Sequence, residues 1–352
     1  MTNYYGLATG IGSLPQGQSK PALDVIFQAV PEIPHWPQLP TAGEEEGFIR
    51  QYLTPLFDRN LVVEAQGRSP YFATDADDWL QRLTAFYEEV LDESDPNAVD
   101  HFGFPQSAAA GFYAFIKHLR EVGTGTALYL KGQLSGPVTM GFQVTDQKLQ
   151  PAFYIDELRD VIVRSLVFQV RWQARMLAAF GLPIILFIDD PGIYAYGQST
   201  FVGLSKEAIQ ESLRPLIEAA HEEGALVGFH ACAGVDWSLL FELPFDLVNI
   251  DVYHYFTSLA LYASEYNAYL SRGGALAWGL VPTSDEVETE TAPGLLARLE
   301  EYFVSLESKG VASKRMRSQL LFTPSCGTGT LSAAQAERVY TLLQEIRNTY
   351  QR

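Results

Sequence analysis

Residues 184–230 read IILFIDDPGIYAYGQSTFVGLSKEAIQESLRPLIEAAHEEGALVGFH, and this stretch decides the fold class. It opens and closes on short apolar runs, at 184–188 and 225–230, which are typical of buried β-strands. Between them, apolar residues recur at spacings of three and four over 206–222, as they do on one face of a helix. A strand, a helix and a second strand in this order predict a βαβ unit with parallel strands.

Six further runs of strand length occur along the chain, and most are separated by stretches long enough for a helix. They are 6–12 (GLATGIG), 60–64 (NLVVE), 127–133 (ALYLKGQ), 246–252 (DLVNIDV), 275–281 (ALAWGLV) and 319–323 (QLLFT). Further helical patterns cover 156–180, 293–309 and 332–349. Eight strands alternating with helices predict an α/β fold, a TIM barrel that occupies residues 1–352 as a single domain. An open doubly wound sheet is the alternative, but no Gly-x-Gly-x-x-Gly turn supports it.

The longest departure from this alternation is the stretch 66–126, between the second and third predicted strands. It carries two helical patterns, at 75–91 and 107–122. We therefore expect a helical insertion that lies over the barrel mouth. The aromatic-rich HWPQLP segment (35–40) shows no readable chemistry, and we expect it to pack across the bottom or the mouth of the barrel.

The composition excludes several classes of partner. The chain has 42 acidic and 24 basic residues and a net charge of −18, so its field repels a nucleic-acid backbone. The opening MTNYYGLATGIGSLPQG lacks the charged and apolar regions of a secretory leader, and no stretch reaches the ~18 apolar residues of a membrane helix. We therefore expect a cytoplasmic protein that meets neither nucleic acid nor membrane. Its two cysteines cannot form a disulfide scaffold, so their thiols are free for packing, chemistry or metal.

Polar side chains follow nearly every predicted strand, where a TIM barrel gathers its catalytic residues. They are Ser13, Glu64, Ser135, Asp189 with Asp190, His230 with Cys232, Asp251, Thr283 and Cys326.

The histidine and the two cysteines of this set predict a zinc site. His230 and Cys232 lie two apart in FHACAG, where an extended backbone puts both side chains on one side, and Cys326 in TPSCGTG can reach the same mouth. Zinc favours nitrogen and thiolate ligands, and a catalytic site keeps three of them and an open position. Asp251 is a candidate fourth ligand, with His254 or water as rivals, but it can instead cap the following segment. Either cysteine alone is more often an inert buried residue.

The remaining candidates predict substrate contacts. Asp189 and Asp190 follow a strongly apolar strand, so we expect Asp189 to pair with a cationic amino group and Asp190 to bind backbone amides. The alternative for both is a helix cap. Ser13 and Ser135 offer hydroxyls beside glycines, where a ligand can approach the backbone, although such pairs also occur in ordinary turns.

Five motifs in this order resemble the C-terminal catalytic barrel of the cobalamin-independent methionine synthases, in the wider uroporphyrinogen decarboxylase-like superfamily. They are TGIGSLPQ, KGQLSGPVT, FIDDPG, FHACAG and TPSCG, and they span nearly the whole chain. The resemblance implies a zinc-bearing TIM barrel that moves a methyl group to the sulfur of homocysteine and so forms methionine. It implies zinc ligation by His230, Cys232 and Cys326. It also implies that Ser13 and Asp189 hold the amino acid part of homocysteine, with Glu64 a looser match.

Two departures from the family bear on the chemistry. Asp251 stands where the family has a glutamate zinc ligand, and the N-terminal barrel that helps full-length members bind methyltetrahydrofolate has no counterpart in these residues. We therefore expect a methylated corrinoid, either methylcobalamin or a corrinoid protein, as the methyl donor, with folate as the alternative. Other readings are methylation of another thiol such as coenzyme M, metal-free tetrapyrrole decarboxylation, and a non-catalytic zinc or corrinoid-binding module.

Overall fold

A computed structural model describes residues 5–92, 95, 97–199, 201 and 203–351. The first four residues of the stretch considered above for a leader, and positions 93, 94 and 96 of the predicted insertion, lie outside the described residues. None of the described helices is both long and apolar enough to cross a membrane.

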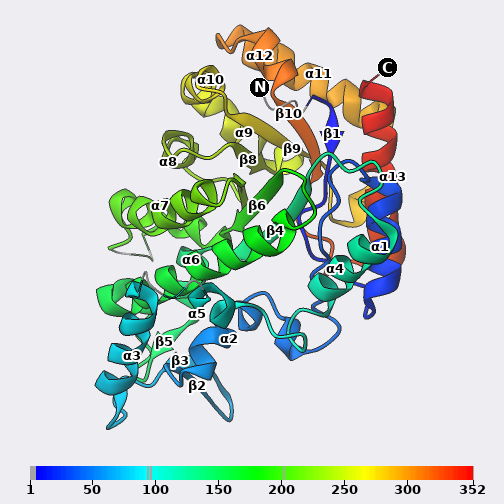
Figure 1. Cartoon of the computed structure of the whole chain (residues 1–352). Helices are drawn as coiled ribbons and strands as arrows, with labels where there is room; N and C mark the ends of the chain where they lie inside the picture. The colour runs from blue at the N-terminus through cyan, green and yellow to red at the C-terminus, as the bar shows by residue number, and fades with distance from the viewer. Residues whose placement is uncertain (1–4, 93–94, 96, 200, 202, 352) are drawn as a thin grey trace.

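Seven parallel strands form one curled sheet, a half-barrel with helices around it (Figure 1), and their order is β1-β10-β9-β8-β7-β6-β4. The strands are β1 (Leu7–Ala8), β4 (Leu130–Ser135), β6 (Ile184–Asp189), β7 (Leu226–Ala231), β8 (Leu247–Ile250), β9 (Ala275–Val281) and β10 (Leu320–Pro324). Each overlaps a predicted run, and all seven are joined in parallel register. This α/β architecture is compatible with a TIM-like barrel.

The prediction that residues 60–64 form the second barrel strand is wrong. β2 (Val62–Ala65) pairs in antiparallel register with β3 (Arg68–Phe72), and β3 pairs with β5 (Thr145–Asp146), so these strands form a separate three-stranded sheet. Only two residues join β2 to β3, and the second, Gly67, has a φ of +75°. A two-residue turn with positive φ makes a hairpin, whereas a parallel pairing needs a long crossover.

The HWPQLP segment runs along the open side of the sheet, between β4 and the chain that follows β1. Trp36 N donates to the carbonyl of Lys131 at 3.4 Å, and His35 and Lys131 form a parallel bridge. On the opposite edge, Gln38 N donates to the carbonyl of Gly12 at 3.1 Å. The segment therefore joins the chain that follows β1 to β4 by backbone hydrogen bonds, rather than crossing the bottom or mouth of the sheet. Its prolines conceal this strand-like role because proline cannot donate to a ladder.

The helices of the described chain include those that the apolar spacing predicts and others that it does not. They are α1 (Ser19–Ala29), α2 (Arg50–Asp58), α3 (Trp79–Leu91), α4 (Ala110–Val122), α5 (Pro137–Gln143), α6 (Asp156–Ala178), α7 (Lys206–Glu222), α8 (Trp237–Glu242), α9 (Val252–Leu259), α10 (Ala263–Ser271), α11 (Ala292–Ser308), α12 (Ser313–Ser318) and α13 (Ala333–Tyr350). The helices predicted from apolar spacing correspond to α3, α4, α6, α7, α11 and α13.

The stretch 66–126 contains β3, α3 and α4. α4 lies beside α1 (Figure 1), and at its start Gly111 meets the backbone of Pro37 so closely that a Cβ would lie 1.7 Å from the Pro37 carbonyl oxygen. Only glycine fits that contact. That the stretch as a whole forms an insertion over the barrel mouth stays a prediction.

Alternate residues of the strands fill the inside of the curled sheet in layers. One apolar layer packs as a cluster separate from the main core, and it includes Leu7, Ile33, Tyr129, Ile185, Leu247 and Leu321. Two residues further along, on the same side, Ile185 is followed by the apolar Phe187, but the other side chains are polar and buried: Thr9, His35, Lys131, Asn249 and Thr323. The layer after that reaches the carboxyl ends of the strands, where the predicted site residues begin.

Candidate metal centre

A cavity of about 290 Å³ lies at the carboxyl ends of the strands. Its lining consists of Ile11, Ser13, Gln38, Pro40, Phe48, Asp189, Pro191, His230, Cys232, Cys326, Gly327, Gly329 and Thr330. The structure therefore brings five of the predicted site residues to one cavity: Ser13, Asp189, His230, Cys232 and Cys326.

His230, Cys232 and Cys326 form the one group in the described part of the chain that is suited to a metal ion. His230 ends β7, Cys232 follows it, and Cys326 follows β10. Their ligand atoms lie within 4.8 Å of one another, and His230 Nε2 is 2.7 Å from Cys232 Sγ. A tetrahedral zinc ion with bonds of about 2.0–2.3 Å holds its ligand atoms at comparable separations. One imidazole and two thiolates are also the donor set that zinc prefers.

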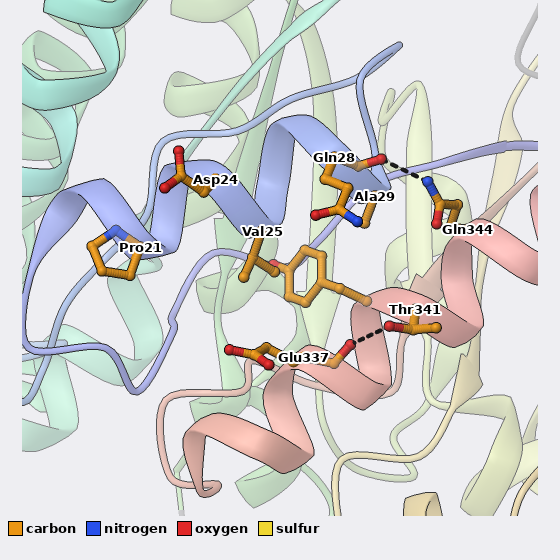
Figure 2. A pocket seen from close by; sticks show the side chains of 9 residues that line it. Pro21, Asp24, Val25, Gln28, Ala29, Glu337, Thr341 and Gln344 are labelled. Atoms are coloured by element: carbon orange, nitrogen blue, oxygen red, sulfur yellow. Dashed lines mark hydrogen bonds between the residues drawn. The ribbon is translucent and has the colours of Figure 1, made fainter.

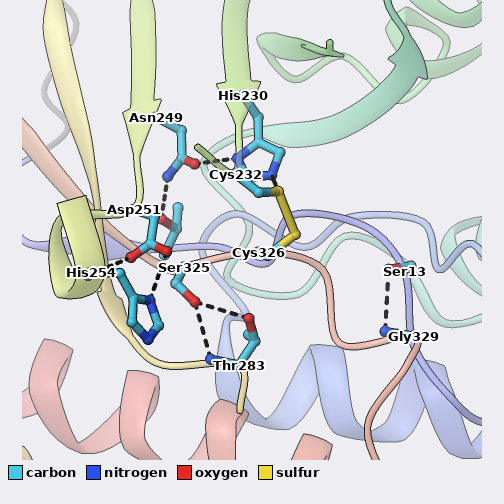
Figure 3. Close-up of a disulfide and its surroundings, with 11 residues drawn as sticks. Ser13, His230, Cys232, Asn249, Asp251, His254, Thr283, Ser325, Cys326 and Gly329 are labelled. Carbon is cyan, nitrogen blue, oxygen red and sulfur yellow. Dashed lines mark hydrogen bonds and ion pairs between the residues drawn. A yellow bond between two sulfur atoms is a disulfide. The ribbon is translucent and has the colours of Figure 1, made fainter. Parts of the chain in front are cut away.

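The structure joins Cys232 to Cys326 by a disulfide (Figure 3), with the two Cα atoms 5.8 Å apart. This differs from the expectation that both thiols are free. The physical reason is the convergence of β7 and β10, which places both sulfurs at one point, as chelation also requires. A disulfide and a pair of zinc thiolates are alternative states of the same two sulfur atoms, because a metal binds cysteine only as the thiolate.

Burial lowers the pKa of His230 to about 4, although its hydrogen bond with Asn249 acts in the opposite direction. The imidazole is therefore neutral near pH 7. A neutral imidazole is the form that can bind a metal ion.

Asp189 presents an unpaired carboxylate oxygen to the cavity. It is almost fully buried, and its Oδ1 accepts no hydrogen bond from any residue that the structure describes. Burial raises its pKa to about 7, against the attraction of the Lys131 ammonium. A buried carboxylate oxygen without a partner is costly, so the cavity is suited to a ligand with a cationic or donor group at this position.

Asp190 binds backbone amides at the start of α5, as predicted. Its carboxylate accepts hydrogen bonds from Val138 N at 3.0 Å and from Thr139 N at 2.7 Å, and the Thr139 hydroxyl donates to it at 2.6 Å. A Cβ on Gly136 would lie 2.3 Å from Asp190, so the SGPVT motif needs its glycine. Asp190 therefore fixes the loop beneath Asp189 and does not line the cavity.

Ser13 is joined to the loop that follows Cys326. Its hydroxyl accepts a hydrogen bond from Gly329 N at 3.3 Å (Figure 3), and its carbonyl accepts one from Thr328 N at 2.9 Å. A Cβ on Gly327 would lie 2.2 Å from the Ser13 hydroxyl oxygen. This wall of the cavity is therefore built of backbone and hydroxyl groups, from two loops that meet because β1 and β10 are neighbouring strands.

Asp251 is not among the convergent metal-type residues. It caps α9 by accepting a hydrogen bond from His254 N at 3.0 Å, and its other oxygen lies 2.8 Å from His254 Nδ1 (Figure 3). His254 Nε2 in turn lies 3.1 Å from Glu286. Both rivals for the fourth ligand position are thus engaged with each other, and the structure shows the capping alternative.

Glu64 and Ser135 do not line the cavity. Glu64 belongs to β2 in the separate small sheet, forms an ion pair with Arg50 and exposes 41% of its side chain. Ser135 donates a hydrogen bond to the carbonyl of Phe48, which is a lining residue. Ser135 therefore stabilises the cavity lining through Phe48 without lining the cavity itself.

Two buried polar residues near the site were missed by the sequence reasoning. Lys131 in β4 donates to the carbonyl of Ile11 and lies 4.6 Å from the centroid of the Phe187 ring, and burial lowers its pKa to about 8. Asn249 in β8 contacts His230. The sequence does show one sign of each residue, namely a polar side chain inside an otherwise apolar run, in YLKGQ and LVNI.

The residues that line the cavity include no lysine or arginine. Binding of a tetrapyrrole with several carboxylates would need such basic residues, so this lining disfavours the tetrapyrrole decarboxylase hypothesis.

A larger hollow of about 410 Å³ lies on the outside, between α1 and α13 (Figure 2). Asp24, Gln28, Glu337 and Gln344 are among its lining residues, and Gln344 donates to the carbonyl of Gln28 at 2.8 Å. None of the predicted site residues is among its lining residues.

The fold and this cavity define an α/β protein with a candidate nitrogen and sulfur metal centre at the carboxyl ends of its strands. No profile of a known protein family matches the chain, and no protein of curated function matches it. Among solved structures, the chain is similar to a B12-independent methionine synthase from Shewanella sp. W3-18-1 in complex with selenomethionine. The two are 16% identical with a TM-score of 0.46, and the match covers 68% of this chain and 66% of that one.

Proposed function

We propose that this chain is a zinc-dependent methyltransferase that moves a methyl group to the thiol of homocysteine and so forms methionine. The observation that carries the proposal is a single cavity with His230, Cys232 and Cys326 at one place and the unpaired carboxylate of Asp189 at another. One small molecule with a thiol and an amino group can meet both. We also propose a complete TIM barrel, in which the HWPQLP segment serves as the second strand.

His230, Cys232 and Cys326 would hold the zinc ion, with a fourth position open to the substrate sulfur. When bound, zinc lowers the pKa of a coordinated thiol so that the thiolate form predominates near neutral pH. Two thiolates and a neutral imidazole would balance the double positive charge of such an ion, which would leave the substrate sulfur nucleophilic. A ligand role for Asp251 stays a prediction in competition with its cap of α9.

The other walls of the cavity would align the substrate. Asp189 would accept hydrogen bonds from its ammonium group, and the Ser13 hydroxyl would donate to its carboxylate. Held in this way, the sulfur attacks the methyl carbon of the donor. The sulfur lone pair forms the new S–C bond, the electrons of the old bond stay with the donor, and the thiol proton passes to solvent.

For the donor we propose a methylated corrinoid, as methylcobalamin or on a corrinoid protein. This donor is the expectation drawn above from the sequence resemblance, and the proposal is tested by comparing two donors. Methylcobalamin and methyltetrahydrofolate, each supplied with homocysteine, distinguish the two donors by the rate of methionine formation. Methionine formed from methyltetrahydrofolate alone contradicts the corrinoid proposal and leaves the zinc site intact.

The test of the reaction uses reduced protein. We expect one zinc per chain by elemental analysis, loss of zinc and of methionine formation in Cys326→Ala, and a preference for homocysteine over coenzyme M. Coenzyme M has no amino group for Asp189, so turnover of both thiols at equal efficiency would contradict the assigned substrate. A Cys326→Ala variant with full zinc and full activity would overturn the scheme. Zinc binding without turnover of any thiol would support the non-catalytic module instead.

A further inference from the structure

We propose that Asn249 is a positioning residue that fixes His230 in the tautomer whose Nε2 faces the metal. The inference rests on the zinc site proposed above. Asn249 in β8 is the register partner of His230 in β7, and its Oδ1 is in contact with His230 Nδ1 (Figure 3). Both side chains are buried, with exposures of 0% for Asn249 and 2% for His230, so water does not compete for this contact.

The orientation of the Asn249 amide is set from the opposite side. Its Nδ2 donates to the carbonyl of Ala277 at 2.9 Å and to the hydroxyl oxygen of Thr323 at 2.5 Å. A backbone carbonyl can only accept, so the NH₂ group must point toward Ala277 and the amide oxygen toward His230. An amide oxygen also only accepts, so the proton of the contact belongs to His230 Nδ1.

This placement of the proton decides which ring nitrogen can bind a metal. A neutral imidazole carries one N–H, so protonation at Nδ1 leaves a lone pair at Nε2. Nε2 is the nitrogen beside the cysteine sulfurs, 2.7 Å from Cys232 Sγ. A hydrogen bond to the far nitrogen of a ligating histidine fixes the ring and raises the basicity of the ligand atom.

The same hydrogen bonds connect the His230 side of the metal site to the Cys326 side. Thr323, which accepts from Asn249, lies in β10, and Cys326 follows the end of that strand. Nearer to the cysteine, the hydroxyl of Ser325 accepts a hydrogen bond from Thr283 N at 3.0 Å. Asn249 thus links the strand that carries His230 to the strand that carries Cys326, through four neighbouring strands of the sheet.

The test compares Asn249→Leu with a matched control, Thr9→Val. Thr9 is also buried inside the sheet and loses one hydrogen bond, to the carbonyl of Ile33, but it has no contact with His230. In reduced protein, competition with a chromophoric chelator measures zinc affinity. We expect Asn249→Leu to bind zinc about 10–100-fold more weakly, and Thr9→Val to bind as the unchanged protein does.

A second readout needs no zinc. In reduced, zinc-free protein, the ¹⁵N shifts of the His230 ring, assigned by their loss in His230→Gln, report which nitrogen carries the proton. We expect protonated Nδ1 in the unchanged protein and a mixture of tautomers in Asn249→Leu. Should that variant fail to fold, Thr323→Val removes one of the two acceptors that orient the amide, and we expect a smaller loss of zinc affinity.

The outcomes separate the two proposals. If the unchanged reduced protein binds no zinc, the proposed function fails, whereas the tautomer is still read from the ¹⁵N shifts. If it binds zinc, the inference about Asn249 is overturned by a protonated Nε2. It is equally overturned if Asn249→Leu and Thr323→Val both keep full zinc affinity.

Discussion

Asp189 is the residue whose substitution separates substrate binding from metal binding. Asn in place of Asp189 keeps the shape of the side chain and removes its charge, and a hydrogen bond to a charged group contributes about 1.5–3 kcal/mol. We therefore expect Asp189→Asn to raise the KM for homocysteine roughly 10–100-fold, with zinc content unchanged. Steady-state kinetics and elemental analysis of the same preparation check this. A thiol acid that lacks the amino group is the control, because its KM does not depend on Asp189.

The raised pKa of Asp189, about 7, predicts a pH dependence for binding. Burial destabilises the anion, yet only the anion pairs with the ammonium group of the substrate. Binding therefore reaches its plateau about one pH unit above 7, and well below 7 it weakens by about tenfold for each unit. The profile of kcat/KM for homocysteine measures this. The decrease in kcat/KM below pH 7 that is due to protonation of Asp189 should be absent in Asp189→Asn. An identical profile in both proteins would contradict the assignment of Asp189 as the partner of the substrate ammonium group.

At the scale of elements, local sequence predicts most of the fold. The spacing of apolar residues gives α7 and β9 with the bounds that the structure has, because those patterns are set within the element. The prediction that residues 60–64 form the second barrel strand was wrong because the place of a strand in a sheet depends on its pairing partners, which its own residues do not display. The predicted run overlaps β2, which pairs with β3 in a hairpin, whereas the proline-containing HWPQLP segment forms its bridges with residues that are distant in sequence.

The candidate site likewise contains residues that local sequence predicts and residues that it does not. Cys326 was predicted because a polar residue after a strand can be recognised from sequence order. Asn249 was missed because its contact with His230 depends on the register between two strands. The role of Asp251 was left between ligand and cap because that choice depends on a contact with His254 that sequence does not display.

The cap at the start of α9 gives a test of the fourth ligand. Asparagine caps helices about as well as aspartate, whereas alanine costs roughly 0.5–2 kcal/mol. We expect Asp251→Asn to keep both stability and zinc affinity, and Asp251→Ala to lose about 1 kcal/mol of unfolding free energy without loss of zinc. Denaturant unfolding and chelator competition measure the two quantities. A weaker zinc affinity in Asp251→Asn would instead show that the carboxylate binds the ion.

For the whole molecule, the two states of Cys232 and Cys326 predict opposite effects on stability and on activity. The disulfide closes a loop across a sequence separation of 94 residues, which in the chain-entropy picture destabilises the unfolded state by roughly 4–5 kcal/mol. Zinc stabilises the reduced protein by binding the folded state in preference to the unfolded one. Reduced, zinc-free protein should therefore have the lowest Tm of the three forms.

Only the zinc form of the reduced protein should form methionine, since oxidation removes both thiolates from the site. Calorimetry of the oxidised, the reduced and the zinc-loaded protein, each assayed for methionine formation, tests this order. His230→Gln is the matched control, because it keeps both cysteines and loses one zinc ligand. Its Tm should respond to oxidation as the unchanged protein does and respond little to zinc. Equal Tm values for all three forms of the unchanged protein would mean that these sulfurs do not join β7 to β10 in solution, by a bond or through a metal.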